Sequence, residues 1–385
     1  MKKILILTRT TTRNFGTVLQ AYALQKSVQS LGYQVFVLDD KSVRTKLAPH
    51  QSDIGSLNRK TIKEILYDYY DQIRLKKMYA RENKIQKQVE CFKKKYITYY
   101  SSDNLNALNE EFDVFISGSD QIWAQTAEPH LYAFFMQDFV WDSKRKISYA
   151  VSIGETEFEY EAGKKVNELI NRFDFLSVRE KTSYEALKPY ACEKKVSIVC
   201  DPVFHIKEEH WLQVSGNRIR KQKYVFCYCL AANEWYFEKM KELTQRFSCE
   251  IIVYCNEKIT FSDGTVLQVC NPKSFLNYII YAEFVLTDSY HAMLFSLIFQ
   301  KNFCVLQRFK SDGKNTQNGR IDYILSLLGI NDKIIDSTVK VNTKPIAYGP
   351  IKKLLDDYRT FSINYLKNAL EYEELHDGEK MDNCN

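Results

Sequence analysis

The chain has 385 residues, of which 45% are hydrophobic and 26% are charged, and its formal net charge is 54 − 48 = +6. This length predicts two domains, and the composition excludes a disordered, collagen-like or coiled-coil protein over most of the chain. The mild positive charge suits an anionic small substrate or an anionic membrane surface, whereas no basic block with base-reading motifs favours nucleic acid.

The distribution of apolar residues and cysteines indicates the compartment. No run of 18 or more apolar residues occurs, so no membrane span is expected, and residues 1–8 hold too few apolar residues for a signal peptide. The ten cysteines show no zinc spacing and no regular disulfide framework. We therefore expect a cytoplasmic protein with reduced thiols and no metal, which could also contact the inner face of the membrane.

The N-terminal residues predict a βαβ unit. Residues 3–8 form a continuous apolar run, as in a strand that is covered on both faces. A polar loop follows at 9–16, and then apolar residues from Val18 to Leu31 recur at helical spacing before the next strand at 34–38.

Residues 44–108 differ from the rest and predict a helical insertion in the first domain. Twelve basic residues lie between Arg59 and Lys95, interleaved with tyrosine and phenylalanine, and one or two helices are expected between about 60 and 96. Two interpretations stay open. The segment is either an exposed charged helix pair or a surface that rests on an anionic bilayer or holds a lipid diphosphate, because basic side chains are attracted to anionic lipid.

After this segment, strands and helices alternate to the end of the chain, with a charged linker expected at 205–223. The predicted strands are 112–117, 146–153, 175–178, 195–199, 224–230, 250–255, 284–287 and 303–306. The predicted helices of the second half are 233–247, 272–282, 292–299, 319–329 and 350–373. Such alternation implies right-handed crossovers and parallel sheets, hence two α/β domains that face each other across a cleft.

In parallel sheets, ligands bind beyond the carboxyl ends of the strands. The polar residues at the predicted strand ends are the 9–16 loop, 118–121, 152–155, Arg179 with Glu180, Asp201, and 288–291. These segments are expected to converge on one site.

The segment Asp288-Ser-Tyr-His291 lies between a buried strand and a helix. Free N–H groups and the dipole make a helix N-terminus an anion site, where His291 can bond a phosphate or act as an acid. Alternatively, Asp288 or Ser289 is merely the N-cap and the histidine is incidental.

Other strand ends carry candidates of the same kind. Arg179 can bind a carboxylate or phosphate in a bidentate manner, or it pairs with Glu180. Asp120 can accept a proton from a sugar hydroxyl, or it is an N-cap. Asn14-Phe-Gly-Thr17 can cradle a ligand with backbone amides, but it is not a dinucleotide fingerprint. The cations Lys301, Arg308 and Lys310 either add charge to a site or form a solvated face.

Four strings in this order resemble the polysaccharide pyruvyl transferase family, over about residues 1–330. They are NFGTVLQAYALQ at 14–25, FDVFISGSDQIW at 112–123, SVRE at 177–180 and TDSYHA at 287–292. The resemblance implies a GT-B-like fold of two Rossmann-like domains. It also implies phosphoenolpyruvate as donor, with pyruvate attached as a ketal to a sugar of a cell-surface glycan, and no further cofactor.

By this resemblance Arg179 and His291 grip the donor, and Asp120 is an acid of the catalytic site. One branch of the family has Arg-Leu-His-Ala where this chain has Ser289-Tyr-His-Ala292, so the second arginine is absent and donor binding must draw charge from elsewhere. The predicted catalytic residues are thus His291 and Asp120. The predicted substrate-binding residues are Arg179, Ser289, Asn14, Gly16, Gly118, Ser119, Gln121 and Asp288.

The expected domains are 1–204 on the acceptor side with the insertion 44–108, 205–345 on the donor side, and 346–385 as a helix that packs back on the first domain plus a tail. The expected acceptor is a sugar, with an undecaprenyl-diphosphate-linked oligosaccharide as one option. Two alternatives remain. One is a nucleotide-sugar glycosyltransferase that holds a ribose with Asp288 or Glu283, and the other is a non-catalytic glycan-binding protein.

Overall fold

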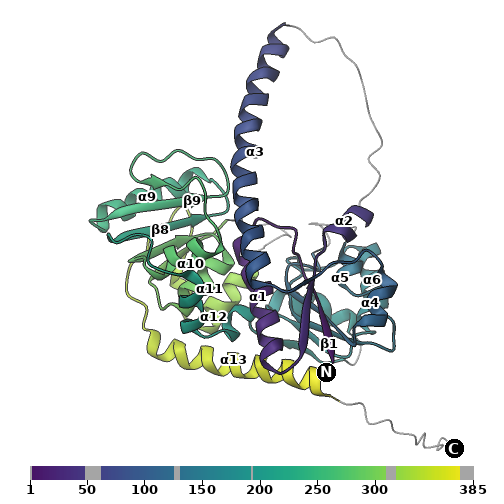
Figure 1. Cartoon of the computed structure of the whole chain (residues 1–385). Coiled ribbons are helices and arrows are strands. Elements are labelled where there is room, and N and C mark those ends of the chain that lie inside the picture. The colour runs from purple at the N-terminus through teal and green to yellow at the C-terminus, as the bar shows by residue number, and fades with distance from the viewer. Residues whose placement is uncertain (1, 48–61, 125–130, 192–193, 309–317, 373–385) are drawn as a thin grey trace, which may run out of the picture.

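The computed structural model describes residues 2–47, 62–124, 131–191, 194–308 and 318–372, without the side chains of 42, 62–78 and 160–161. Within these residues the chain forms two α/β domains, each built on a parallel sheet. Figure 1 shows the domains side by side, with one long helix rising between them and another running beneath both. The predicted fold class is therefore confirmed.

The N-terminal domain contains a seven-stranded sheet in the order β3-β2-β1-β4-β5-β6-β7. Its strands are β1 (Lys3–Leu7), β2 (Gln34–Leu38), β3 (Tyr99–Tyr100), β4 (Val114–Asp120), β5 (Arg145–Val151), β6 (Leu176–Val178) and β7 (Val196–Ile198). Its helices are α1 (Phe15–Ser30), α2 (Lys41–Leu47), α3 (Ile62–Tyr96), α4 (Leu105–Glu111), α5 (Tyr132–Phe135), α6 (Tyr160–Ile170) and α7 (Lys181–Leu187). Burial on both faces explains the continuous apolar runs of β1 and β4, since each is covered by helices.

The C-terminal domain repeats this plan with a six-stranded sheet in the order β10-β9-β8-β11-β12-β13. Its strands are β8 (Tyr224–Cys229), β9 (Glu250–Cys255), β10 (Thr265–Val266), β11 (Phe284–Thr287), β12 (Phe303–Leu306) and β13 (Ile334–Ile335). Its helices are α8 (Glu208–Ser215), α9 (Glu234–Arg246), α10 (Pro272–Ile280), α11 (Tyr290–Ile298) and α12 (Gly319–Leu327).

The last helix, α13 (Tyr348–Glu371), connects the two domains. The Tyr348 hydroxyl at its start donates to the Lys301 carbonyl of the second domain. Near its end, Ser362 Oγ accepts the Cys200 N–H at 2.8 Å, and Arg145 Nη1 donates to the Leu370 carbonyl at 3.1 Å. The helix therefore fastens the second domain to the edge of the first sheet.

Two segments differ from the expectation. The segment 205–223, expected as a linker, contains α8, whose Trp211 is fully buried, and the charged residues around it disguised this short amphipathic helix. The segment 44–108 holds the single long helix α3, but it also supplies β3, which pairs with β2 as the outermost strand of the sheet. A strand of two residues is too short to leave a periodic pattern. No described helix is both long enough and apolar enough to cross a membrane.

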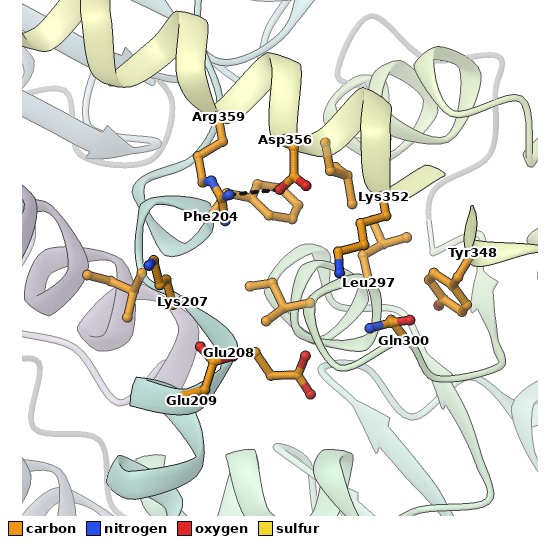
Figure 2. Close-up of a pocket in the computed structure, with 13 residues that line it drawn as sticks. Phe204, Lys207, Glu208, Glu209, Leu297, Gln300, Tyr348, Lys352, Asp356 and Arg359 are labelled. Carbon is orange, nitrogen blue, oxygen red and sulfur yellow. Dashed lines mark ion pairs between the residues drawn. The ribbon is translucent and has the colours of Figure 1, made fainter. Parts of the chain in front are cut away.

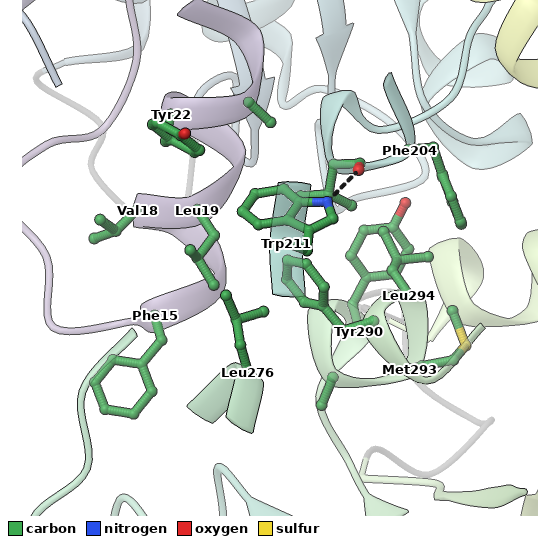
Figure 3. Close-up of a cluster of buried hydrophobic side chains, with 14 of the residues drawn as sticks. Phe15, Val18, Leu19, Tyr22, Phe204, Trp211, Leu276, Tyr290, Met293 and Leu294 are labelled. Carbon is green, nitrogen blue, oxygen red and sulfur yellow. Dashed lines mark hydrogen bonds between the residues drawn. The ribbon is translucent and has the colours of Figure 1, made fainter. Parts of the chain in front are cut away.

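Trp211 lies in a hydrophobic cluster that joins the two domains (Figure 3). Its ring meets Tyr22 of α1 at a centroid distance of 5.7 Å and Phe295 of α11 at 5.0 Å, both edge to face. Its Nε1 donates to the Val203 carbonyl at 3.2 Å, so the polar atom of the indole is satisfied as well. One side chain thus contacts helices of both domains.

We predict that Trp211→Ala lowers the free energy of unfolding by about 3–5 kcal/mol, because it leaves a large cavity between the domains. Urea unfolding followed by circular dichroism measures the change. The matched control is Leu212→Ala, because Leu212 is the next residue of the same helix and is 37% exposed. Equal losses in the two variants would contradict the role given to the indole.

Candidate active site

A pocket of about 300 Å³ opens between the domains at the carboxyl ends of their strands. The strand-end rule predicted this location. The residues that line it come from both domains and are mostly polar: Arg9, Thr12, Asn14, Thr17, Asp120, Gln121, Leu230, Asn256, Ser289, Tyr290, His291, Arg308 and Arg320. Of the predicted site residues, the structure brings together Asn14, Asp120, Gln121, Ser289 and His291 on this surface.

Arg179 lies beneath the pocket and is 0% exposed. Its Nη2 contacts Asp120 Oδ1 and its Nη1 contacts Asp201 Oδ2, both at 3.0 Å, while its Nε is 3.4 Å from Glu180 Oε2. Burial lowers the pKa of a guanidinium, but these carboxylates outweigh it and raise the pKa of Arg179 above its usual value. Because its donors face carboxylates rather than the pocket, these contacts favour a positioning role over direct contact with a substrate.

Asp120 ends β4 and presents its carboxylate to the pocket. Its Oδ2 accepts the Thr17 hydroxyl at 2.5 Å, and its Oδ1 accepts from Arg179. Burial alone would raise the pKa of Asp120, but the charges of Arg179 and His291 and the bond from Thr17 hold it well below its usual value. Asp120 is therefore a fixed negative charge at neutral pH.

Asp201 joins His291 of the second domain to Arg179 of the first. His291 Nε2 lies 3.4 Å from the same Oδ2 that Arg179 contacts, and the other oxygen accepts the Val203 N–H at 3.1 Å. Burial would raise the pKa of Asp201, but His291 and Arg179 lower it below its usual value. The imidazole and the guanidinium thus approach the same carboxylate oxygen from opposite domains.

The start of α1 lies directly against the histidine ring. Asn14 is the N-cap of this helix, and its Oδ1 accepts the N–H of Gly16 at 2.9 Å. A Cβ added at Gly16 would lie 2.3 Å from Cγ and 2.4 Å from Nδ1 of His291. Gly16 is therefore needed for the close approach of the histidine, which comes from the other domain.

The arginines among the described lining residues come from three separate segments. Arg9 follows β1, Arg308 follows β12, and Arg320 lies in the first turn of α12. Burial and the charge of Arg179 lower the pKa of Arg320 to about 10, so it stays protonated at neutral pH. Together with His291 they make the pocket strongly cationic above the buried carboxylates.

Tyr290 contacts two arginines, the buried Arg179 and Arg320 of the pocket lining. The Cζ of Arg179 lies 4.7 Å from the centre of its ring, and the Cζ of Arg320 lies 5.5 Å from the same centre. An aromatic face attracts cations, so a ring close to two guanidinium groups reduces the cost of placing like charges close together. This contact explains why a tyrosine at position 290 suits the site.

Besides Arg179 and Gly16, three predicted substrate-binding residues do not reach the pocket lining. Gly118 has φ +143°, and a Cβ there would lie 2.0 Å from the Tyr149 carbonyl oxygen, so the position serves sheet packing. Ser119 is fully buried, and its Oγ donates to the Ala150 carbonyl at 3.0 Å. Asp288 accepts the N–H groups of Leu230 and Ala231, so it fastens a loop of its own domain. All three lie at strand ends, but the contacts of Ser119 and Asp288 stay within the protein.

Sequence reasoning missed two cations of the pocket and undervalued a third. Arg9 lies in a loop that the strand-end rule selected, but no pattern distinguished it within that loop. Arg308 lies two residues after a predicted strand, and a solvated face was the preferred interpretation of it. Arg320 begins a helix on no recognisable motif, and only tertiary packing brings it to the pocket. In the described part of the chain, no group of three or more His, Cys, Asp or Glu side chains is placed to hold a metal ion.

A second pocket, of about 240 Å³, lies where α13 passes the connection between the domains (Figure 2). Its floor includes Phe204 and Leu297, and its rim mixes lysines with acidic side chains and the Arg359–Asp356 ion pair at 2.8 Å. None of the predicted site residues lines it. The balanced charges distinguish it from the cationic pocket.

The fold and site define a two-domain α/β protein of GT-B-like architecture with a cationic pocket between its domains. The family model of polysaccharide pyruvyl transferases matches residues 14–308. The chain therefore belongs to the polysaccharide pyruvyl transferase family of enzymes. The family prediction made from the four strings is confirmed.

The fold is distantly similar to those of solved structures, among them a UDP-GlcNAc 2-epimerase and MurG. The UDP-GlcNAc 2-epimerase of Methanocaldococcus jannaschii has 13% identity and a TM-score of 0.47, with 94% of this chain and 93% of that chain covered. MurG of Acinetobacter baumannii has 9% identity and a TM-score of 0.39, with coverage of 96% and 97%. These values carry no argument about activity. A comparison with curated proteins finds no match.

We predict that Gly16→Ala displaces the His291 ring by more than about 1 Å, because carbon atoms in contact normally lie about 3.5–4.0 Å apart. A crystal structure of the variant, or the histidine signals in an NMR spectrum, measures the displacement. The matched control is Gly349→Ala, since a Cβ added at Gly349 meets nothing within 4 Å. An unmoved imidazole in the Gly16 variant would contradict the contact.

Proposed function

We propose that this enzyme transfers pyruvate from phosphoenolpyruvate to a pair of sugar hydroxyls as a cyclic ketal. The observation that carries the proposal is the meeting of His291 with Arg9, Arg308 and Arg320 in one interdomain pocket. Phosphoenolpyruvate carries a carboxylate and a phosphate, and both are attached to the same carbon. Guanidinium groups bind both anions in a bidentate manner, so the pocket has the cations that such a donor needs.

The arginines of the pocket also supply the charge that the sequence motif lacks. Ser289 stands where one branch of the family has an arginine, and Ser289 Oγ accepts the Ala292 N–H at 3.4 Å as the N-cap of α11. Arg308 and Arg320 line the same pocket from the same domain. We assign donor binding to these two side chains with Arg9, in place of the absent residue.

The reaction consists of two additions to one carbon. Protonation of the donor's methylene carbon makes the adjacent carbon electrophilic, and a sugar hydroxyl adds there with loss of its proton. The bond from this carbon to the phosphate oxygen then breaks, and a second hydroxyl adds and loses its proton. Of the two protons released, one replaces the proton given to the methylene carbon and the other leaves on hydrogen phosphate.

His291 is the proposed acid for the first step. We assign the proton transfer to Nδ1, because Nε2 lies 3.4 Å from Asp201 Oδ2. Nδ1 lies beside Gly16 at the start of α1. A negative partner on one nitrogen orients the ring. Asp201 is thus a positioning residue, and Arg179 holds Asp201 in place.

Asp120 is the proposed stabiliser of the positive carbon. Its position at a strand end predicted a base for the sugar hydroxyl, and its place on the pocket surface is consistent with contact to the acceptor. Its strongly lowered pKa makes it a weak proton acceptor, however. A fixed negative charge close to the reacting carbon suits electrostatic stabilisation better.

A nucleotide-sugar glycosyltransferase would need an acidic residue that can hold the ribose, and neither candidate is placed to do so. Asp288 is occupied by backbone N–H groups of its own domain. Glu283 precedes β11 and so lies at the opposite end of that strand from the pocket, where it is 3.9 Å from Lys223. Neither carboxylate is placed to hold a ribose.

The acceptor is proposed to be a sugar of a cell-surface glycan under assembly, carried by a lipid diphosphate at the inner face of the membrane. Helix α3 supports this location because it extends away from the body of the protein (Figure 1). Along its described part, the exposed residues Lys84, Lys87 and Lys94 recur at helical spacing on one face, opposite the buried Ile85 and Val89. A basic stripe of this kind is attracted to anionic lipid.

We predict that His291→Ala and Arg320→Ala each lower turnover at least about a hundredfold, because each removes a charged donor at the reacting groups. Turnover is measured as phosphate release with a sugar acceptor, and the ketal product is identified by mass spectrometry. The control is Arg246→Ala, an exposed arginine in the last turn of α9. Near-normal turnover in both pocket variants, or stabilisation by UDP rather than phosphoenolpyruvate in a thermal shift, would overturn the proposal.

We predict that reversing the charge of Lys84, Lys87 and Lys94 lowers binding to vesicles of anionic phospholipid about a hundredfold, since each basic residue near such a surface contributes about 1 kcal/mol. Sedimentation with vesicles measures the bound fraction. The matched control reverses Lys221, Lys223 and Lys241, which are also exposed. Equal sedimentation of the two triple variants, or no sedimentation of the unchanged protein, removes the membrane assignment.

A further inference from the structure

A third pocket, of about 450 Å³, lies at the outer edge of the N-terminal sheet, away from the cationic pocket. It is formed where β6 and β7 begin and where the second half of α13 crosses them. Its lining residues are Asp174, Phe175, Leu176, Lys194, Lys195, Ser197, Phe361, Asn364, Tyr365 and Asn368. None of these residues takes part in the proposed reaction.

Aromatic rings form one wall of this edge pocket. Phe175 and Tyr365 meet edge to face at a centroid distance of 6.4 Å, and the Tyr365 hydroxyl donates to the Ser148 carbonyl at 3.3 Å. Phe361 stands one helical turn before Tyr365 and is 51% exposed. A phenylalanine kept half exposed beside a pocket marks a surface that a ligand can cover.

Side-chain amides lie on the same face of α13 as these rings. Asn364 and Asn368 are exposed and four residues apart, so they follow each other along the helix. Within the described part of the chain neither amide makes a hydrogen bond, so both retain donors and acceptors for a ligand. Rings that cover C–H faces, beside amides that bond hydroxyls, are the chemistry that recognises a pyranose.

The far wall of the edge pocket is basic. Lys194 and Lys195 are both exposed, and Lys194 Nζ donates to the Phe173 carbonyl at 2.5 Å. The acidic residue of the lining, Asp174, accepts the Lys146 N–H at 2.7 Å and so is partly occupied. The lining thus has a net positive charge, which suits a carboxylate on the bound group.

We propose that the edge pocket binds a sugar unit of the acceptor glycan that already carries a pyruvate ketal. The sugar ring lies against Phe361 and bonds the amides of Asn364 and Asn368, and the ketal carboxylate faces Lys195. The identity of the carboxylate rests on the proposed function, whereas the sugar site itself does not. β6 spans three residues, so the edge pocket lies only about 10 Å from Arg179 along the strand.

A glycan held at this edge presents its next unit to the active site at a raised local concentration. Such tethering requires a chain long enough to pass from the sheet edge to the pocket between the domains. It therefore favours polymeric acceptors over single sugars. The proposed ketal transfer itself does not depend on the edge pocket.

The test is a ligand-observed NMR titration, without donor, of methyl galactoside and of its 4,6-pyruvate ketal against the full chain. We expect the ketal to bind more tightly than the neutral sugar. Phe361→Ala should weaken both at least about fivefold, as expected for the loss of an aromatic contact. Lys195→Gln should reduce the affinity of the ketal to that of the neutral sugar.

The matched control is Leu354→Ala, because Leu354 is on the same helix, is 43% exposed and does not line the edge pocket. It should bind both sugars like the unchanged protein. Absence of binding, or equal losses in Phe361→Ala and Leu354→Ala, overturns the sugar site, and equal affinity for the two sugars overturns the carboxylate assignment. Because the titration needs no turnover, its failure is distinct from failure to form a ketal.

Discussion

The carboxylate of Asp201 connects the two halves of the active site. One of its oxygens lies 3.0 Å from the guanidinium of Arg179 in the first domain and 3.4 Å from the imidazole of His291 in the second. The other oxygen is fixed by a backbone N–H at the start of the connection between the domains. The same side chain therefore contacts a cation of the first domain and the histidine of the second.

A fully buried arginine is costly unless its charge is matched, and this requirement shapes the surrounding residues. Asp120, Asp201 and Glu180 approach Arg179 from different strand ends of the first sheet. The same attraction keeps Asp120 ionised in spite of its burial. The negative charge that Asp120 presents to the pocket is thus a consequence of how the sheet accommodates one buried cation.

The sequence predicted where the pocket lies. It did not distinguish the residues that line the pocket from the buried residues beneath it. The carboxyl ends of parallel strands meet at one edge, so a rule that needs only strand positions brought Asn14, Asp120 and His291 together. Whether a strand-end side chain points into the pocket depends on backbone twist and on its neighbours. That is why Arg179 and Asp288, which lie at strand ends as predicted, were expected to contact a substrate but instead contact groups of the protein. Arg320 lies on a helix whose position is set by packing alone, and no local pattern reveals such a residue.

Several arginines can share one small pocket because buried carboxylates lie beneath them, around Arg179. Arg179 and Arg308 lower the pKa of Arg320, whereas Asp120 and Glu180 raise it. The buried carboxylates outnumber the one guanidinium that they surround, so their excess negative charge offsets the repulsion among the cations above them. The ring of Tyr290 lies within 6 Å of the guanidinium carbons of both Arg179 and Arg320. An anionic donor therefore meets arginines that are held in place before it arrives, and little of its binding energy is lost in ordering them.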